Sequence, residues 1–418
     1  MSRILAYTSP ALGHLYPLVP ILDELAARGH EIHVRTLAEA VPMLLARGFS
    51  AEPISAQVAD VALDDWHTRN PQKALAAAVR AFSDRAPFDA TDLRASIADV
   101  EPDAVIVDVN SWGAVAAAEQ WGGPFATLCP YPIALGSRDV PPYGPGLAPA
   151  HGAWGRARDA LLRPVVTGAL ERKMLGPLNA VRGSLSLPEL AHADDMFRRP
   201  PLVLYLTAEP FEYARTDWPD SVVMVGPCAW DPPTDRPRWL DDVEVPLVLV
   251  TTSSEFQDDG RLVTAALEAL ADEPVHVVAT MPAAARGRIR VPANARVEEF
   301  LPHGMILDAA VCAVTHGGMG ATQKALERGV PVVAVPFGRD QHEVARRLEV
   351  SRAGVRLPLR RLSPDRLRAA VAAARSRTDG ARRVAAGFRS AGGAPAAASA
   401  VETRLLHVGQ VGSGSMGA

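Results

Sequence analysis

Residues 315–341 read THGGMGATQKALERGVPVVAVPFGRDQ, and this stretch decides the fold. An apolar run ends at Thr315, glycines open a helical pattern that stops at Gly329, and a second apolar run follows at residues 330–337. A strand, a helix and a strand at this spacing predict a right-handed βαβ unit in a parallel sheet. The glycines also allow backbone N–H groups at the helix start to face an anion, which the helix dipole favours.

The neighbouring loops supply a context for this turn, since a glycine-rich turn alone is equally compatible with an ordinary tight turn. Asp340 and Gln341 follow the second apolar run, and threonines and serines at residues 251–254 follow the apolar run 247–250. The carboxyl ends of parallel strands meet at one sheet edge, where α/β proteins bind ligands. A carboxylate beside an amide offers acceptors and donors to hydroxyl groups. The sequence therefore predicts a site for a diphosphate beside a polyol.

Strand and helix patterns alternate along the rest of the chain and predict two halves of similar architecture. In the N-terminal half, strands are expected at residues 4–7, 31–36, 103–109 and 124–130, with helices at 15–28, 39–47 and 114–121. In the C-terminal half, strands are expected at 247–252, 276–279, 295–300, 311–316 and 330–337, with a helix at 260–270. Four prolines in GPCAWDPPTDRPR, residues 226–238, indicate a stiff linker. The patterns at 57–87 and 131–190 are less regular.

Composition narrows the class of protein. A chain of 418 residues suits two domains, and a net charge of -4 gives no attraction to nucleic acid. Three scattered cysteines match no metal site and suit a reducing compartment. No signal peptide or membrane-spanning run is recognisable, so we expect a cytoplasmic protein without a transmembrane segment. Asp–Asp pairs at 64–65, 194–195, 241–242 and 258–259 favour solvated capping over metal binding.

A histidine and an aspartate follow two strands of the predicted N-terminal sheet. His14 comes after the strand at 4–7, and Asp108 lies at the end of the apolar run 103–109. His14 alone would fit an ordinary histidine at a helix start, but both residues are expected at the same sheet edge. Histidine can take a proton from a hydroxyl, and a carboxylate can orient the imidazole and stabilise its cation. We predict that His14 is a catalytic base and Asp108 its partner.

These motifs together resemble one enzyme family. GHLYPLVP at residues 13–20, FLPH at 300–303 and the stretch 315–341 are similar in order and spacing to family 1, GT-B-fold glycosyltransferases. That group includes plant UDP-sugar transferases and actinobacterial enzymes that decorate antibiotics. The resemblance implies an α/β GT-B fold, in which two facing Rossmann-like domains with parallel sheets enclose an interdomain cleft.

The resemblance also implies roles for matching residues. Phe300 would stack beside the nucleobase, Leu301 would meet the base through its backbone, and the loop 316–322 would hold the diphosphate. Asp340 and Gln341 would hold sugar hydroxyls. The donor-binding set is Ser253, Ser254, Phe300, Leu301, His303, His316, Gly317, Gly318, Gly320, Ala321, Thr322, Asp340 and Gln341. An apolar acceptor pocket is predicted from Trp66, Phe82, Trp112, Tyr131 and Trp154, although packing of long surface helices explains these aromatic residues equally well.

The expected domains follow from the same comparison. Residues 1–225 would bind the acceptor, 226–240 would form the proline-rich linker, and 241–385 would bind the nucleotide sugar. Helices in 386–407 would cross back to the N-terminal domain, and 408–418 would be a flexible tail.

We therefore expect an inverting glycosyltransferase that moves a sugar from a TDP- or UDP-sugar to a hydroxyl of a small hydrophobic natural product, without a metal or another cofactor. Two alternatives stay open, a non-catalytic GT-B auxiliary protein and a nucleotide-sugar epimerase. His14 and Asp108 argue against the first, and the Asp340–Gln341 pair argues against the second. The expected partners are the donor and the acceptor, with no nucleic acid. The identity of the sugar and a homodimer are left open.

Overall fold

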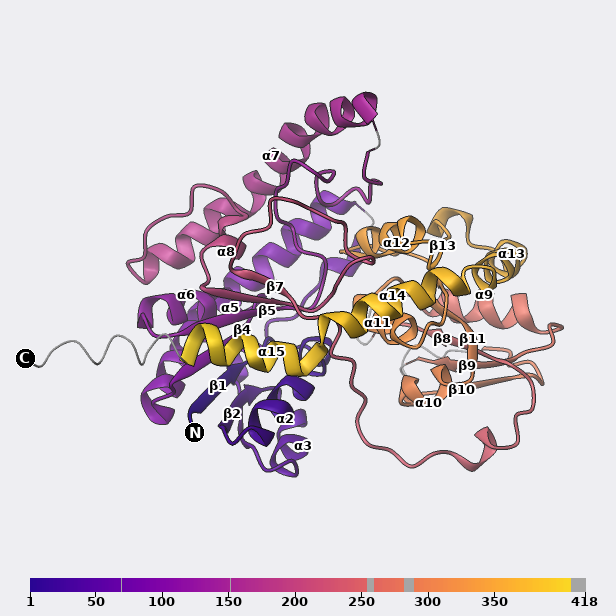
Figure 1. The fold of residues 1–418 in the computed structure, drawn as a ribbon, viewed down its shortest axis with the longest axis horizontal. Coiled ribbons are helices and arrows are strands. Elements are labelled where there is room, and N and C mark those ends of the chain that lie inside the picture. Colours follow the sequence, from indigo (N-terminus) through magenta and orange to yellow (C-terminus); the bar gives the residue numbers. More distant parts are fainter. Residues whose placement is uncertain (69, 151, 254–258, 282–288, 407–418) are drawn as a thin grey trace, which may run out of the picture.

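Two parallel β-sheets, each flanked by helices, form the two halves of the molecule (Figure 1). The structure is a computed structural model and describes residues 1–68, 70–150, 152–253, 259–281 and 289–406. The prediction of a parallel α/β architecture in both halves is confirmed.

The first sheet has seven parallel strands in the order β3-β2-β1-β4-β5-β6-β7. Its central strands are almost wholly apolar because helices cover both faces. Alternate residues of β1 enter different cores, with Ile4 and Ala6 on one face and Leu5 and Tyr7 on the other. The strands are β1 (Arg3–Tyr7), β2 (Glu31–Thr36), β3 (Ser50–Pro53), β4 (Ala104–Asp108), β5 (Phe125–Cys129), β6 (Leu202–Tyr205) and β7 (Val222–Met224).

The second sheet has six parallel strands in the order β10-β9-β8-β11-β12-β13. In both sheets the chain moves outward in one direction from the first strand and then continues on its other side. The strand order therefore reverses between β1 and β4 and between β8 and β11, and ligands of open α/β sheets bind at such reversals. The strands are β8 (Leu247–Thr251), β9 (His276–Thr280), β10 (Ala295–Glu298), β11 (Ala310–Thr315), β12 (Val332–Ala334) and β13 (Gly354–Arg356).

Two helices of the N-terminal half are far longer than the sequence pattern indicates. The first of the less regular segments, 57–87, overlaps α5 (Pro71–Val100), and the second, 131–190, contains α7 (Gly152–Ser184), which alone has 33 residues. Prolines inside both helices interrupt the apolar periodicity, which explains why the pattern does not show them. The other helices of this half are α1 (Leu12–Leu15), α2 (Val19–Ala27), α3 (Val41–Leu45), α4 (Ala56–Ala59), α6 (Trp112–Trp121) and α8 (Asp195–Arg198), with 3₁₀ turns η1 (Ala38–Ala40) and η2 (Asp65–His67).

The helix expected at 15–28 corresponds to α2, but its start is wrong, because a separate α1 and a turn come before Val19. Pro17 lies in that turn and has no N–H with which to continue the first helix. The break places His14 in a short helix of its own, directly after the loop that follows β1.

The C-terminal half has shorter helices, and its last helix returns to the first sheet. α15 (Gly393–Val401) packs against α2, and its Ala397 and Val401 belong to the first core (Figure 1). The remaining helices are α9 (Gly260–Leu270), α10 (His303–Leu307), α11 (Met319–Glu327), α12 (Gln341–Val350), α13 (Pro364–Arg375) and α14 (Thr378–Ala391), with 3₁₀ turns η3 (Arg238–Leu240) and η5 (Leu359–Arg361) and a π-helical turn η6 (Glu402–Leu406).

The chain passes between the two halves twice, and the two passages touch. The first begins at Gly226, and the second runs through Gly392 and Gly393 between α14 and α15. The backbone N–H of Gly393 donates to the carbonyl oxygen of Val225 at 2.6 Å. A Cβ at Gly226, whose φ is +81°, would lie 2.9 Å from the carbonyl oxygen of Phe388, so only glycine fits this contact.

Candidate active site

The reversal point of the first sheet holds a histidine and a buried aspartate. Nδ1 of His14, after β1, lies 2.6 Å from Oδ2 of Asp108, the last residue of β4. The Asp108 side chain is fully buried, whereas 17% of the His14 side chain is exposed. An Nδ1–H that donates to the carboxylate leaves the Nε2 lone pair as the proton acceptor. The structure thus brings together the two residues predicted to form the base.

Two further residues, which the sequence did not single out, hold this pair. Ser9 Oγ donates to Asp108 Oδ2 at 3.0 Å, and the Asn110 backbone N–H donates to Asp108 Oδ1 at 2.7 Å. The Asn110 side-chain amide reaches Nε2 of His14 at 3.4 Å, and Asn110 Oδ1 accepts from the Tyr131 hydroxyl at 2.7 Å. Their only signal was their place at the ends of β1 and β4, where polar side chains converge.

The reversal point of the second sheet holds the glycine-rich turn. Gly317 has a φ of +90°, which places its backbone in the left-handed region, and Gly318 caps the start of α11. The ring of His316 lies so close that a Cβ at Gly318 would come within 2.2 Å of its Nε2. After β8 the chain reaches the buried Ser253, whose backbone N–H donates to Asp259. The backbone therefore opens toward a ligand where a side chain would block it.

Two buried polar atoms of this turn lack a partner. Nδ1 of His316 and Oγ1 of Thr322 make no hydrogen bond with any residue that the structure describes. Such orphaned groups cost free energy unless a ligand or water satisfies them. Burial lowers the pKa of His316 to about 4, so the imidazole is neutral at pH 7 and can offer an N–H without a positive charge. These observations fit an anion held by N–H groups at the start of α11.

Asp340 and Gln341 begin α12 at the same edge. The side-chain oxygen Oε1 of Gln341 accepts from the backbone N–H groups of Phe337 at 2.7 Å and Gly338 at 3.1 Å, which fixes the loop before α12. Burial raises the pKa of Asp340 to about 6, against the opposing positive charges of Arg339 and His14. Arg339, the residue before Asp340, contacts Asp65 of the N-terminal half, so the loops of the two halves meet beside this edge.

Comparison with known proteins gives this geometry a context. The chain is 34% identical over 390 residues to 4'-demethylrebeccamycin synthase of Lentzea aerocolonigenes, a match that covers 89% of this chain and 91% of that protein. The present chain therefore belongs to the family 1 GT-B glycosyltransferases. Residues 264–400 of this glycosyltransferase also match the family model described as erythromycin biosynthesis protein CIII-like, C-terminal domain.

Solved structures share the fold of this glycosyltransferase. The kitacinnamycin glycosyltransferase superposes with a TM-score of 0.72 at 22% identity, covering 97% of this chain and 99% of that one. Glycosyltransferase VinC in complex with dTDP superposes with a TM-score of 0.69 at 22% identity, covering 98% of this chain and the whole of VinC. The GT-B fold expected from the sequence motifs is therefore confirmed.

The residues predicted to meet the nucleobase lie on the loop after β10. The Phe300 side chain is 52% exposed, whereas Leu301 is buried. Nε2 of His303 lies 3.0 Å from the Thr280 hydroxyl, and burial lowers the pKa of His303 to about 4. In this glycosyltransferase the Phe300 ring is thus accessible to a ligand, whereas the His303 side chain already has a hydrogen-bond partner in Thr280. Ser254 lies outside the described residues.

The predicted acceptor residues do not form one cluster. Tyr131 stands beside the base, with its ring centroid 5.7 Å from that of His14. Phe82 and Trp112 contact each other at 5.5 Å between centroids, in a core between α5, α6 and α7. Trp154 is 91% exposed on α7, apart from both groups. The side chain of Trp66 lies outside the described part of the structure.

The prediction of solvated caps for the Asp–Asp pairs is wrong for one member of each of two pairs. Asp65 is buried and pairs with Arg339, and Asp259 is buried and holds the Ser253 backbone. Among the residues that the structure describes, no group of three His, Cys, Asp or Glu side chains is placed to hold a metal ion. In the same part of the chain, no helix combines the length and the apolar character needed to cross a membrane.

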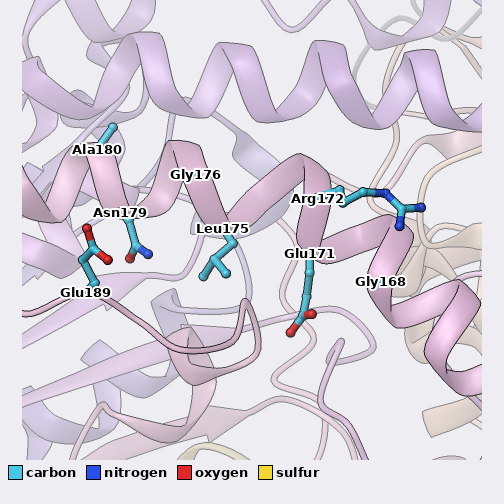
Figure 2. Close-up of a pocket in the computed structure, with 8 residues that line it drawn as sticks. All are labelled: Gly168, Glu171, Arg172, Leu175, Gly176, Asn179, Ala180 and Glu189. Atoms are coloured by element: carbon cyan, nitrogen blue, oxygen red, sulfur yellow. The ribbon is translucent and has the colours of Figure 1, made fainter.

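A hollow of about 810 Å³ lies on α7, away from these loops (Figure 2). Figure 2 shows Glu171, Leu175 and Asn179 on one side of the helix, with Glu189 from the following loop beside Asn179. None of the residues that line it belongs to the sheet edges that carry His14, Asp108 or Asp340. The reversal points, and not this hollow, therefore define the candidate active site of the glycosyltransferase.

The close contact at Gly318 yields a first prediction. Gly318→Ala is expected to weaken nucleoside diphosphate binding about tenfold, because the new methyl group must displace the His316 ring from the turn. Isothermal titration calorimetry with dTDP and UDP measures the loss. Gly183→Ala is the matched control, since a Cβ there meets nothing within 4 Å, and it should bind like the wild type. Wild-type affinity in Gly318→Ala would show that this turn does not hold the diphosphate.

Proposed function

We propose that this enzyme transfers a sugar, with inversion, from a nucleoside diphosphate donor to a hydroxyl of a small hydrophobic natural product, and that His14 is the base. The observation that carries the proposal is the 2.6 Å contact between His14 and the buried Asp108 at the edge of the first sheet. In this proposal His14 is the proton acceptor, and Asp340 on the other half is the carboxylate that binds sugar hydroxyls.

The donor is proposed to be a TDP-sugar, with a UDP-sugar as the alternative. VinC, which has the same fold, was solved in complex with dTDP, and a relative that matches most of this chain is 4'-demethylrebeccamycin synthase. The start of α11 and the loop 316–322 would hold the diphosphate, and Phe300 would stack on the base. Asp340 and Gln341 would contact the sugar.

The reaction then follows from the two halves of the site. Nε2 of His14 takes the proton of the acceptor hydroxyl, and the new C–O bond forms on the face of the anomeric carbon opposite the diphosphate. The bond between that carbon and the diphosphate oxygen breaks, so the configuration inverts. Backbone N–H groups of α11 stabilise the negative charge on the leaving group, a task that does not require a metal ion. Asp108 stabilises the imidazolium until it releases the proton.

The division of labour between the halves is part of this proposal. Residues 1–225 would bind the acceptor, and residues 241–385 would bind the donor, joined by the linker 226–240. Helices in 386–407 would tie the donor half back to the acceptor half. Each substrate would then sit mainly on one half, and catalysis would need both halves closed.

A donor and acceptor screen tests the proposal. Thermal unfolding with dTDP and UDP identifies the preferred nucleobase, because a ligand that binds the native state raises the midpoint of unfolding. Incubation of the preferred nucleotide sugar with a panel of hydroxylated aromatic and macrolide acceptors, in the presence of EDTA, should yield a product of inverted configuration by NMR. Release of an epimerised donor without acceptor, or retention of configuration, would overturn the proposal.

The unusual pKa of Asp340 predicts a pH dependence of sugar recognition. An ordinary aspartate is ionised above pH 4, but the pKa of Asp340 is about 6, so its carboxylate is lost as the pH falls from 7 to 5. The affinity for the nucleotide sugar, whose diphosphate stays ionised, should therefore fall over this range. Calorimetry with the nucleotide sugar at pH 5 and 7.5 measures the fall, which should be absent in Asp340→Asn. An equal fall in Asp340→Asn would exclude this role.

A further inference from the structure

An ion pair joins the loops of the two halves next to the candidate site. Nε of Arg339 donates to Oδ2 of Asp65 at 2.7 Å, and its NH2 group donates to Oδ1 at 2.7 Å. Only 5% of the Asp65 side chain and 24% of the Arg339 side chain are exposed. A bidentate arginine–carboxylate pair of this kind is directional and stronger than a single contact between point charges.

The two partners come from different halves of the molecule. Arg339 directly precedes Asp340 in the loop that Gln341 ties down. Its backbone is left-handed, with a φ of +51°, which is unusual for arginine and indicates that surrounding contacts determine the loop. Asp65 lies in η2, within the connection from β3 to α5 on the acceptor half. The pair therefore links the donor loop directly to a segment of the other half.

We propose that Asp65 and Arg339 form a clasp that holds the acceptor half closed over the bound donor and thereby excludes water from the anomeric carbon. The clasp rests on the proposed function, because it acts on the donor that Asp340 would hold. Both residues are positioning residues. They set the distance between the Asp340 loop and the half that carries His14, and they take no part in proton transfer.

Water exclusion gives the clasp a measurable consequence. When water replaces the acceptor, it forms the bond to the anomeric carbon, the bond to the diphosphate breaks, and free sugar and nucleoside diphosphate are released. A closed cleft suppresses this side reaction. Arg339→Gln and Asp65→Asn should each raise the ratio of donor hydrolysis to transfer about fivefold to tenfold, which is typical of coupled ion-pair partners. The double variant should be no worse than either single variant, since one interaction is lost in all three.

Two variants separate the clasp from a general loss of structure. Arg339→Lys keeps the charge but loses the fork, so it should restore only part of the wild-type ratio. Arg346→Gln removes another arginine that bridges the halves, through Gly146, but does not border Asp340, and its ratio should stay at the wild-type value. Additive effects in the double variant, or an equal rise in Arg346→Gln, would overturn the clasp.

A binding measurement tests the clasp independently of turnover. In the wild type, dTDP or UDP bound at the donor loop should slow amide hydrogen exchange in the peptide that covers residues 60–68, whereas in Arg339→Gln it should not. Unchanged coupling in the variant would refute the clasp even if transfer occurs. Failure of the wild type to transfer sugar, with dTDP-dependent protection of 60–68 intact, would instead refute the proposed function and leave the clasp standing.

Discussion

Replacement of His14 by alanine is expected to lower kcat for sugar transfer by about 10²- to 10⁴-fold, the usual contribution of a positioned base. Binding of the nucleoside diphosphate should stay close to the wild type, because the turn predicted to hold it belongs to the other sheet. Single-turnover transfer assays and calorimetry with the preferred nucleoside diphosphate measure the two effects. Near-normal turnover in His14→Ala would remove the base assignment.

Matched variants define what this loss means. His33 also contacts a carboxylate, Glu31 at 2.8 Å, but it lies on β2, so His33→Ala should retain full activity. Asp108→Asn should lose a large part of the activity, and the double variant with His14→Ala should be no slower than His14→Ala alone. Residues that act as a unit show this lack of additivity. Independent losses would mean that Asp108 serves the fold and not the imidazole.

Replacement of Arg347 by methionine is expected to destabilise the protein by about 3–5 kcal/mol, the typical cost of breaking a buried ion pair. The Arg347 guanidinium, only 2% exposed, donates to both oxygens of Glu212 at 3.0 and 2.8 Å and to Glu343 at 2.9 Å. Methionine would leave Glu212 with Arg215 as its nearest cation, at 3.7 Å, and Glu343 with only backbone N–H donors among the described residues. Urea unfolding followed by circular dichroism measures the change.

Two comparisons test whether the buried charges are the cause. Arg368 contacts Asp365 and Glu273 at the surface, so Arg368→Met should cost less than about 1 kcal/mol. Adding Glu343→Gln to Arg347→Met should recover part of the loss, because it removes a buried charge that has no other ion-pair partner in the described part of the chain, while the amide oxygen can still accept from the backbone of Gly144 and Gly146. A double variant as unstable as the sum of its parts would point to lost packing instead.

The same network predicts the direction of acid sensitivity. Burial alone would raise the pKa of Glu212, but the charge and hydrogen bonds of Arg347 more than reverse this, so the pKa lies below its ordinary value. A depressed carboxyl pKa contributes stability at neutral pH, and this contribution is lost as the pH falls through the folded-state pKa. The contribution should therefore vanish only in strong acid.

Local patterns were sufficient to predict the core strands of both sheets. The apolar runs that became β1, β4, β8 and β11 are bounded by turn residues, and their order alone placed His14 near Asp108. Four strands of three or four residues were missed, whereas β10 and β12, which are as short, were expected within longer predicted segments. The missed strands are β3, β6, β7 and β13.

The contacts that bring the halves together could not be predicted. Asp65 and Arg339 are 274 residues apart, and Asp65 read as a solvated cap because nothing local distinguishes it from an exposed aspartate. Internal prolines hid α5 and α7 from the sequence pattern. The aromatic residues assigned to one acceptor pocket therefore proved to lie in separate places. Sequence patterns describe one element at a time, and these features depend on how elements meet.

The contact between Gly226 and Gly393 has a mechanical consequence. Because both covalent passages between the halves run through this one point, the chain acts there as a single pivot. Relative motion of the halves is then restricted to rotation, with translation largely prevented. The bonds away from the pivot that such a rotation must break include those from Arg339 to Asp65, from Glu343 to the backbone of Gly144 and Gly146, and from Arg346 to the carbonyl oxygen of Gly146. The halves can then reorient only by turning about one point, and these side chains hold their resting orientation.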